Sequence, residues 1–217
     1  MNLKKLFLVL MVAALASVSM AQGFRGGGRM MGNTPAGLLQ RPDVQTELVL
    51  TDEQKTKLGD IRDGMRDKFR EAFQNAGDDA AARQKAMTDL MADVTKQINA
   101  VLTADQQKRL KQISMQMSSY GILVNDTDLQ TQLKLSDDQK SKIADMSKQQ
   151  QAANAAIMEK IRNQEMQFQE AGPIFQKNQT ALNDGIGKVL TDAQKAQFKD
   201  LSGKTFTETD PPPGGNR

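Results

Sequence analysis

The clearest pattern in the chain is the return of apolar residues at steps of three and four in a polar background, with charged residues between them. Such spacing places the apolar side chains on one face of a helix. It predicts one helix from Asp52, a second after Gly77–Asp79, where GDD offers a stop and a new cap, and a shorter third from Thr103 to about Gly121. Their apolar positions are Leu58, Ile61, Met65, Phe69 and Phe73; Met87, Leu90, Met91, Val94, Ile98 and Val101; and Leu110, Ile113 and Met117.

The same pattern then starts again. Asp43–Arg62 aligns with Asp128–Ser147 at an offset of 85, with 10 of 20 positions identical, and Ile98–Gln106 aligns with Ile186–Gln194 at an offset of 88. The alignments predict a tandem duplication, in which each half holds a long, a second and a short third helix.

The join between the halves, Met117–Asp128, is short and is interpreted as a linker. In the second half we expect a longer first helix, from about Asp137 to Glu170. The AGP of Ala171–Pro173 is expected to end it, with the proline at the start of the next helix.

Four copies of the motif L-[ST]-x-x-Q mark the predicted helix starts. Its Ser or Thr followed three residues later by Gln is a capping box, in which the hydroxyl and the amide each satisfy a backbone N–H. The leucine before each cap is expected to pack against an apolar residue seven positions after the cap, namely Leu58, Leu110, Ile143 or Phe198. The motif residues are Leu50, Thr51 and Gln54; Leu102, Thr103 and Gln106; Leu135, Ser136 and Gln139; and Leu190, Thr191 and Gln194.

Outside the helices the composition is different. Residues 1–21 have Lys4 and Lys5 followed by an apolar run, which is typical of a cleaved secretory signal peptide. The predicted organisation is a signal at 1–21, a flexible glycine-rich segment at 22–35, helical units at 36–120 and 121–206, and a disordered proline-rich tail at 207–217. Without the signal the balance is 27 basic (29 − 2) and 26 acidic residues, so no basic footprint for a nucleic acid is expected.

The recurring L-[ST]-x-x-Q motif behind a signal peptide resembles the Spy/CpxP family of periplasmic proteins, whose signature is LTxxQ. The resemblance covers about residues 36–206 and implies an all-α fold, a thin curved cradle and a periplasmic location. Family members carry two motifs and dimerise, whereas this chain has four. Two units in one chain are therefore expected to form a pseudo-dimeric cradle or, alternatively, two separate beads; a further homodimer stays open.

The resemblance implies an ATP-independent chaperone that holds unfolded or partly folded envelope proteins. A CpxP-like adaptor that binds the periplasmic domain of a sensor kinase is the alternative, and a metal-responsive protein is the third. Client binding is expected on apolar and basic side chains, although ordinary core or solvated positions explain each residue as well. The candidates are Arg62, Arg66, Phe69, Arg70, Phe73, Met87, Met91, Ile157, Ile161, Met166 and Phe168.

The composition limits the kinds of catalytic and metal-binding site that the chain can form. The chain has no His and no Cys, which removes the commonest general base and the thiol nucleophile, so we expect no enzyme and no cofactor. Zinc and nickel sites usually need the same residues, so no metal site is expected. Thioethers bind Cu(I), which leaves Met30–Met31 and Met115 with Met117 as conceivable ligands, although packing explains the other methionines better.

Overall fold

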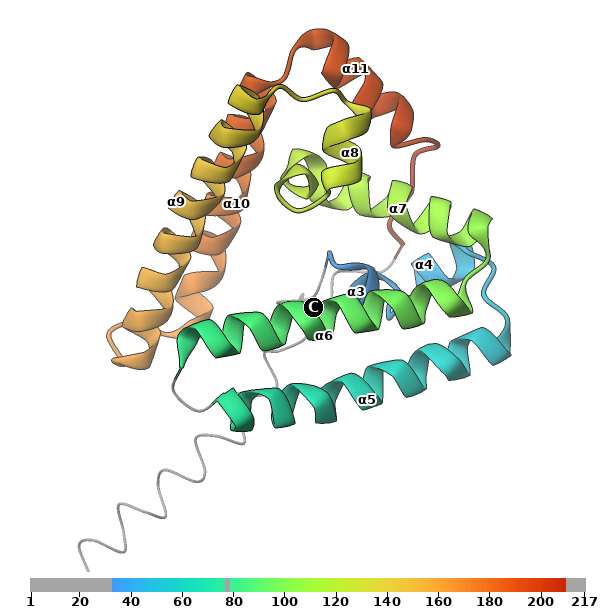
Figure 1. The fold of residues 1–217 in the computed structure, drawn as a ribbon, viewed down its shortest axis with the longest axis horizontal. Helices are drawn as coiled ribbons and strands as arrows, with labels where there is room; N and C mark the ends of the chain where they lie inside the picture. Colours follow the sequence, from blue (N-terminus) through green and yellow to red (C-terminus); the bar gives the residue numbers. More distant parts are fainter. Residues whose placement is uncertain (1–32, 77–78, 210–217) are drawn as a thin grey trace, which may run out of the picture. The chain divides into compact units, whose positions relative to one another are not determined.

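The computed structural model describes residues 33–76 and 79–209 (Figure 1). Every regular element in these ranges is a helix, which confirms the predicted all-α class. The predicted signal peptide, residues 22–32 and residues 210–217 of the predicted tails lie outside the described part. None of the described helices combines the length and the apolar character needed to cross a membrane.

The chain divides into two compact units within helix α7, Ala104–Ser118. Unit 1 holds the chain up to Gln106 together with the segment from Glu208 onward, and unit 2 is Gln107–Thr207. The sequence repeat predicted a boundary at residue 121 instead, so the predicted boundary and the boundary in the structure differ by most of α7. Unit 1 is therefore built from two pieces of chain that are far apart in the sequence.

Unit 1 contains two short helices and one long helical hairpin. The short helices are α3, Pro35–Leu38, and α4, Pro42–Glu47, each with a proline in its first turn, where the missing N–H is harmless. The hairpin pairs α5, Asp52–Ala76, with α6, Ala80–Val101 (Figure 1). The predicted cap at Asp79 is confirmed, since its carboxylate accepts from the N–H groups of Ala81 and Ala82. The buried apolar residues of this unit are Leu38, Leu39, Val44, Leu48, Leu50, Met65, Leu90, Val94, Ile98 and Leu102.

Unit 2 repeats this order of elements. After α7 it has the 3-10 helix η2, Ser119–Val124, and α8, Thr127–Gln132; a hairpin of α9, Asp137–Arg162, and α10, Phe168–Val189, follows, and α11, Asp192–Leu201, ends it. One apolar cluster fills its centre, where the ring of Phe198 meets that of Tyr120 edge to face at a centroid distance of 5.0 Å. The buried members are Met115, Leu123, Leu129, Leu133, Leu135, Ile143, Leu182, Ile186, Leu190 and Phe198.

The duplication is also visible in backbone detail. Val49 and Lys134, the equivalent residues that precede the first motif of each half, both have a left-handed backbone, with φ of 49° and 52°. In each half a glutamine of the short helix, Gln45 or Gln130, donates to a backbone carbonyl six or seven residues earlier at 2.7 Å. The two halves therefore share the turn that leads into the long hairpin.

The predicted course of the second hairpin was wrong in two respects. Helix α9 ends at Arg162 and not near Glu170, because Gln164 turns to a φ of 61° and Glu170 accepts from the N–H of Gln167 to start α10. Pro173 does not open a helix but lies inside α10. It removes one helical hydrogen bond near the exposed N-terminal end, where the Gln169 carbonyl can bond water instead.

The segment interpreted as a linker is structural. Met117–Asp128 completes α7, forms η2 and supplies Asp126 as the cap of α8, where its carboxylate accepts from the N–H of Leu129. Leu123 in this segment is completely buried in the unit 2 cluster. Tyr120, Ile122 and Val124 pack against the same cluster, so this segment contributes to the core of unit 2.

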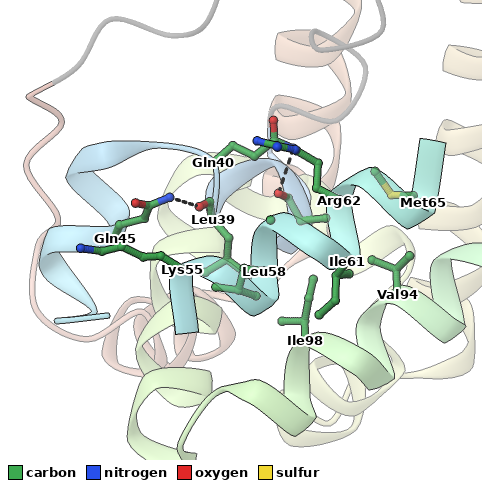
Figure 2. A pocket seen from close by; sticks show the side chains of 12 residues that line it. Leu39, Gln40, Gln45, Lys55, Leu58, Ile61, Arg62, Met65, Val94 and Ile98 are labelled. Carbon is green, nitrogen blue, oxygen red and sulfur yellow. Dashed lines mark hydrogen bonds between the residues drawn. The ribbon is translucent and has the colours of Figure 1, made fainter. Parts of the chain in front are cut away.

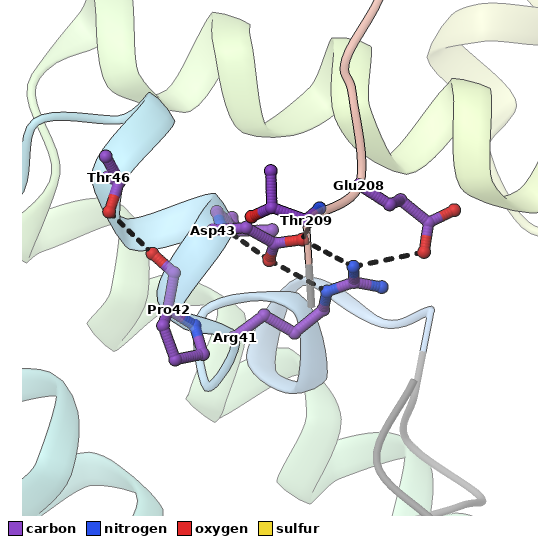
Figure 3. Close-up of polar contacts among 7 residues, drawn as sticks. Arg41, Pro42, Asp43, Thr46, Glu208 and Thr209 are labelled. Atoms are coloured by element: carbon purple, nitrogen blue, oxygen red, sulfur yellow. Dashed lines mark hydrogen bonds and ion pairs between the residues drawn. The ribbon is translucent and has the colours of Figure 1, made fainter. Parts of the chain in front are cut away.

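A buried ion pair joins the two pieces of unit 1 (Figure 3). Arg41 donates to the carboxylate of Asp43 at 2.6 and 3.0 Å and to Glu208 at 3.0 Å, while the N–H of Thr209 donates to Asp43. The side chains of Arg41 and Asp43 are only 4% and 2% exposed, whereas Glu208 is 45% exposed. The hydrogen bonds to Asp43 raise the pKa of Arg41 above its ordinary value, against the opposing effect of burial.

We predict that the two carboxylates contribute unequally. Asp43→Asn leaves a buried guanidinium without its main counter-charge, so unit 1 should lose about 3 kcal/mol of stability, the size expected for breaking a buried pair. Glu208→Gln removes a half-exposed partner and should cost less than about 1 kcal/mol. Urea unfolding of both variants checks this; equal losses would contradict it.

A second prediction concerns Val49, a β-branched residue in the left-handed region whose side chain is 80% exposed. Its backbone strain has no compensating packing, and Asn tolerates this conformation better. Val49→Asn should therefore raise the free energy of unfolding by about 1 kcal/mol. Val49→Thr keeps the branched side chain and serves as the control, which should give no gain; an equal gain would show that polarity rather than strain is responsible.

Candidate functional site

The predicted capping boxes are present at all four motifs. In the first, Thr51 Oγ1 accepts from the N–H of Gln54 at 3.2 Å, and Gln54 Oε1 accepts from the N–H of Thr51 at 3.1 Å. The same reciprocal bonds form at Thr103, Ser136 and Thr191, with donor–acceptor distances between 2.9 and 3.3 Å. Each motif thus fixes the first turn of a helix.

The glutamines do more than cap, because they bind one another in pairs. In unit 1, Gln54 Nε2 donates to Gln106 Oε1 at 2.7 Å, and Gln106 Nε2 donates to Gln54 Oε1 at 3.1 Å. The remaining amide protons reach backbone carbonyls, that of Val101 from Gln54 and that of Leu48 from Gln106. We call this arrangement the amide pair.

Every polar atom of the amide pair is satisfied. Each Oε1 accepts from one backbone N–H and one side-chain amide, and each Nε2 donates to one carbonyl and one side chain. Because both glutamines are half-buried, a missing partner is poorly replaced by water. The pair therefore holds the starts of α5 and α7 together and anchors both to the ends of α4 and α6.

Unit 2 contains the same amide pair. Gln139 and Gln194 exchange bonds of 2.8 and 3.0 Å, and they donate to the carbonyls of Val189 and Leu133 at 2.9 and 3.2 Å. The leucines of the motifs are also alike, since Leu50, Leu102, Leu135 and Leu190 are all buried. Of their expected apolar partners, Leu110, Ile143 and Phe198 are buried and Leu58 is half-buried.

The sequence predicted the four caps but not the pairing of their glutamines. The signal was available, because the motifs occur in two pairs whose glutamines are 52 and 55 residues apart. A separation of this length between two motifs fits one helical hairpin. The helix that starts the hairpin and the helix that follows it then begin at the same end of the hairpin. Periodicity along one helix cannot reveal a contact that depends on two helices meeting.

The candidate client-binding residues of unit 1 lie along its hairpin. Arg62, Arg66 and Arg70 are exposed on α5, and Phe69 is half-buried. Met87 and Met91 on α6 are also half-buried. The side chain of Phe73 lies outside the described part of the structure. The part of the hairpin farthest from the amide pair therefore keeps its apolar side chains within reach of solvent.

The candidates of unit 2 lie at the corresponding end of the second hairpin. Ile157 and Ile161 on α9 are half-buried, as is Met166 in the turn between the helices. Phe168, at the start of α10, is 41% exposed. Phe69, Met87 and the candidates of unit 2 lie toward the hairpin ends remote from the motifs, whereas Arg62 and Met91 lie near the middle of α5 and α6.

Unit 1 has a cavity of about 100 Å³ between its hairpin and its short helices (Figure 2). Side chains of α5 and α6 converge on it, while Gln40 and Gln45 come from the α3–α4 segment. A neighbouring cavity of about 160 Å³ shares Ile61, Met65 and Val94 with it. The first is lined by Ala36, Leu39, Gln40, Gln45, Lys55, Leu58, Gly59, Ile61, Arg62, Met65, Val94 and Ile98.

Exposed ion pairs flank this cavity. Lys55 lies 3.3 Å from Asp52, and Arg62 donates through Nε to Asp63 at 3.0 Å. The hydrogen bond from Arg62 lowers the pKa of Asp63 below its ordinary value. Such exposed pairs are weak and easily exchange partners.

The structure describes two of the conceivable copper ligands, Met115 and Met117. Met115 is 2% exposed and belongs to the apolar cluster of unit 2, so it would have to leave that core to meet an ion. Met30 and Met31 lie outside the described residues. Within residues 33–76 and 79–209, no group of three His, Cys, Asp or Glu side chains is placed to hold a metal.

Comparisons with protein-family models, with curated proteins and with solved structures gave no match. The resemblance to the Spy/CpxP family therefore rests on the four motifs. What the structure adds is a role for each motif residue within one chain.

We predict that the amide pair contributes more to the free energy of unfolding than a helix cap alone. Gln54→Glu keeps the shape but replaces a donor of two bonds by a carboxylate, and should lower the free energy of unfolding by about 2–3 kcal/mol at neutral pH. Glu53→Gln, one residue away and exposed, is the control and should change stability far less.

A double-mutant cycle separates the pair from its caps. Gln54→Ala and Gln106→Ala should each destabilise unit 1, and the double variant should lose about 1 kcal/mol less than the sum of the two. Strict additivity, measured by denaturant unfolding, would mean that the two glutamines act independently.

Proposed function

We propose that the protein is a periplasmic, ATP-independent chaperone that holds unfolded or partly folded envelope proteins. The observation that carries the proposal is the half-exposed apolar side chains at the remote ends of both hairpins. Two helices that pack only on each other leave part of their apolar faces exposed. A third layer of helices would be needed to cover the rest. The motif resemblance supports the same function.

The chemistry of these surfaces suits weak and unselective capture. Met and Phe side chains adapt to many partners, and burying the rest of a half-exposed one contributes only about 1 kcal/mol. A client held by a few such contacts can leave again without a nucleotide to release it. The exposed arginines of α5 add an attraction for acidic segments.

The proposal includes the arrangement that the resemblance implies. Two units in one chain, each with its own amide pair, would supply the two halves of one cradle. The sequence without His and Cys agrees with a binding role rather than catalysis. A signal peptide at residues 1–21 would direct the protein to the periplasm.

Suppression of aggregation tests the function. The chain without residues 1–21 is added, with no ATP, to several unrelated chemically unfolded clients, and turbidity is followed. We expect strong suppression at near-equal molar amounts, because capture is stoichiometric. Bovine serum albumin at the same concentration controls for non-specific protection.

A variant makes the test specific. Phe69→Ser combined with Met91→Ser removes half-exposed apolar area from one hairpin and should weaken suppression while the amide pair keeps the fold. If the unmodified chain protects none of the clients, the holdase proposal fails. Tight binding to a single sensor domain, without general protection of clients, would support the adaptor function instead.

A further inference from the structure

The two hairpins differ where their helices meet. In unit 2, Gln150 bonds Gln179 at 3.0 Å and Asn154 bonds Asn178 at 2.8 Å, which closes the contact between α9 and α10 with amides. The repeat offsets of 85 and 88 place Met65, Phe69, Leu90 and Met91 at these positions in unit 1. At these equivalent positions the second hairpin has amide pairs and the first has apolar side chains. The first hairpin has its polar contact elsewhere, where Lys68 of α5 lies 2.6 Å from Asp93 of α6.

The two units fill the space beside the hairpin differently. In unit 2, Met146 and Tyr120 pack so closely that a side chain at Gly185 or Gly187 would meet them at 2.6 or 3.1 Å. In unit 1 the residue equivalent to Met146 is the shorter Ile61, and the residue equivalent to Gly185 is the larger Gln97, which lines the second cavity together with Ile61.

Two glycines of α5 enlarge this space. Gly59 lines the first cavity and Gly64 the second, and an added Cβ at either position would meet no atom within 4 Å. A glycine inside a helix costs about 1 kcal/mol relative to alanine. No close contact in the described structure requires a glycine at either position, and both leave open space beside the helix.

The rim of the first cavity favours a negative partner. Its lining includes Lys55 and Arg62 and no carboxylate. Arg62 uses its Nε for Asp63, and its two terminal nitrogens make no hydrogen bond to the described residues, so they can bind a carboxylate in a forked geometry. Residues 22–32 of the chain, with Arg25, Arg29 and no acid, are a poor occupant by charge.

We propose that these two cavities form a client groove of unit 1, in which the acidic group of the partner binds at the first cavity, because Asp60 lines the second. The groove takes one aliphatic side chain of an extended segment, and a carboxylate next to that side chain binds Arg62 and Lys55. The inference rests on the chaperone function and assigns it a substrate chemistry: segments in which an aliphatic residue adjoins an acidic one.

The test uses a variant that is more stable than the natural chain. Gly59→Leu places a good helix former where an added Cβ meets no atom within 4 Å, and its side chain extends into the groove, so we expect the melting temperature to rise while binding falls. The matched control is Ala144→Leu, the equivalent position in unit 2. The probe is a short fluorescein-labelled peptide with one Leu flanked by Glu, read by fluorescence anisotropy.

We expect Gly59→Leu to weaken peptide binding by about tenfold and Ala144→Leu to leave it unchanged. The same peptide with Lys in place of Glu should bind about tenfold more weakly, and Arg62→Gln should remove most of that preference. Arg66→Gln, on the same helix but outside the lining, should not.

Several outcomes would overturn the groove while leaving the chaperone function standing. These are full aggregation suppression without peptide binding, equal effects of Gly59→Leu and Ala144→Leu, or binding that ignores the flanking charge. Tighter peptide binding after deletion of residues 22–32 would show that the chain's own segment occupies the groove. Failure of the unmodified chain to suppress any aggregation would instead refute the proposed function.

Discussion

Each unit depends on a pair of side-chain amides that hydrogen-bond to each other. Where two helices begin side by side, several backbone N–H groups and the carbonyls of neighbouring helix ends have no partner within their own helix. One Gln from each motif satisfies its own cap, its counterpart and a carbonyl of another helix, with distances of 2.7–3.2 Å in both units. This network sets how the hairpin meets the short helices, and the buried leucines pack around it.

Because the motif end of each unit is well stabilised, apolar side chains can be exposed at the other end of the hairpin. A thin helical layer buries little apolar area per residue, so most of its stability must come from a region where packing and polar satisfaction coincide. In both units that region is next to the motifs, where Leu50, Leu102, Leu135 and Leu190 are buried. The remote hairpin ends can then carry half-exposed Met, Ile and Phe side chains without deciding whether the unit folds.

The sequence predicted features that arise within one helix. Apolar spacing predicted α5, α6 and α7, and the Ser/Thr-x-x-Gln pattern predicted the caps of α5, α7, α9 and α11. It missed α3, α4 and α8, which have only four to six residues and too few turns to show a period. The prediction for Pro173 was wrong because the energetic cost of a proline inside a helix depends on whether the carbonyl that loses its hydrogen bond can bond water instead. The amide pairs and the unit 1 cavity depend on helices that are distant in sequence, and a single chain without its fold does not show them.

The ion pair between Arg41 and Glu208 has a consequence for how the chain matures. Its partners are 167 residues apart, and all of unit 2 lies between them in the sequence. Closing such a long loop is slow compared with forming a local hairpin. When the chain emerges in order from its N-terminal end, unit 2 has its complete sequence before unit 1 receives its last piece. The first half made is thus the last to receive its complete sequence, and the contact that it gains last is the one to the half-exposed Glu208.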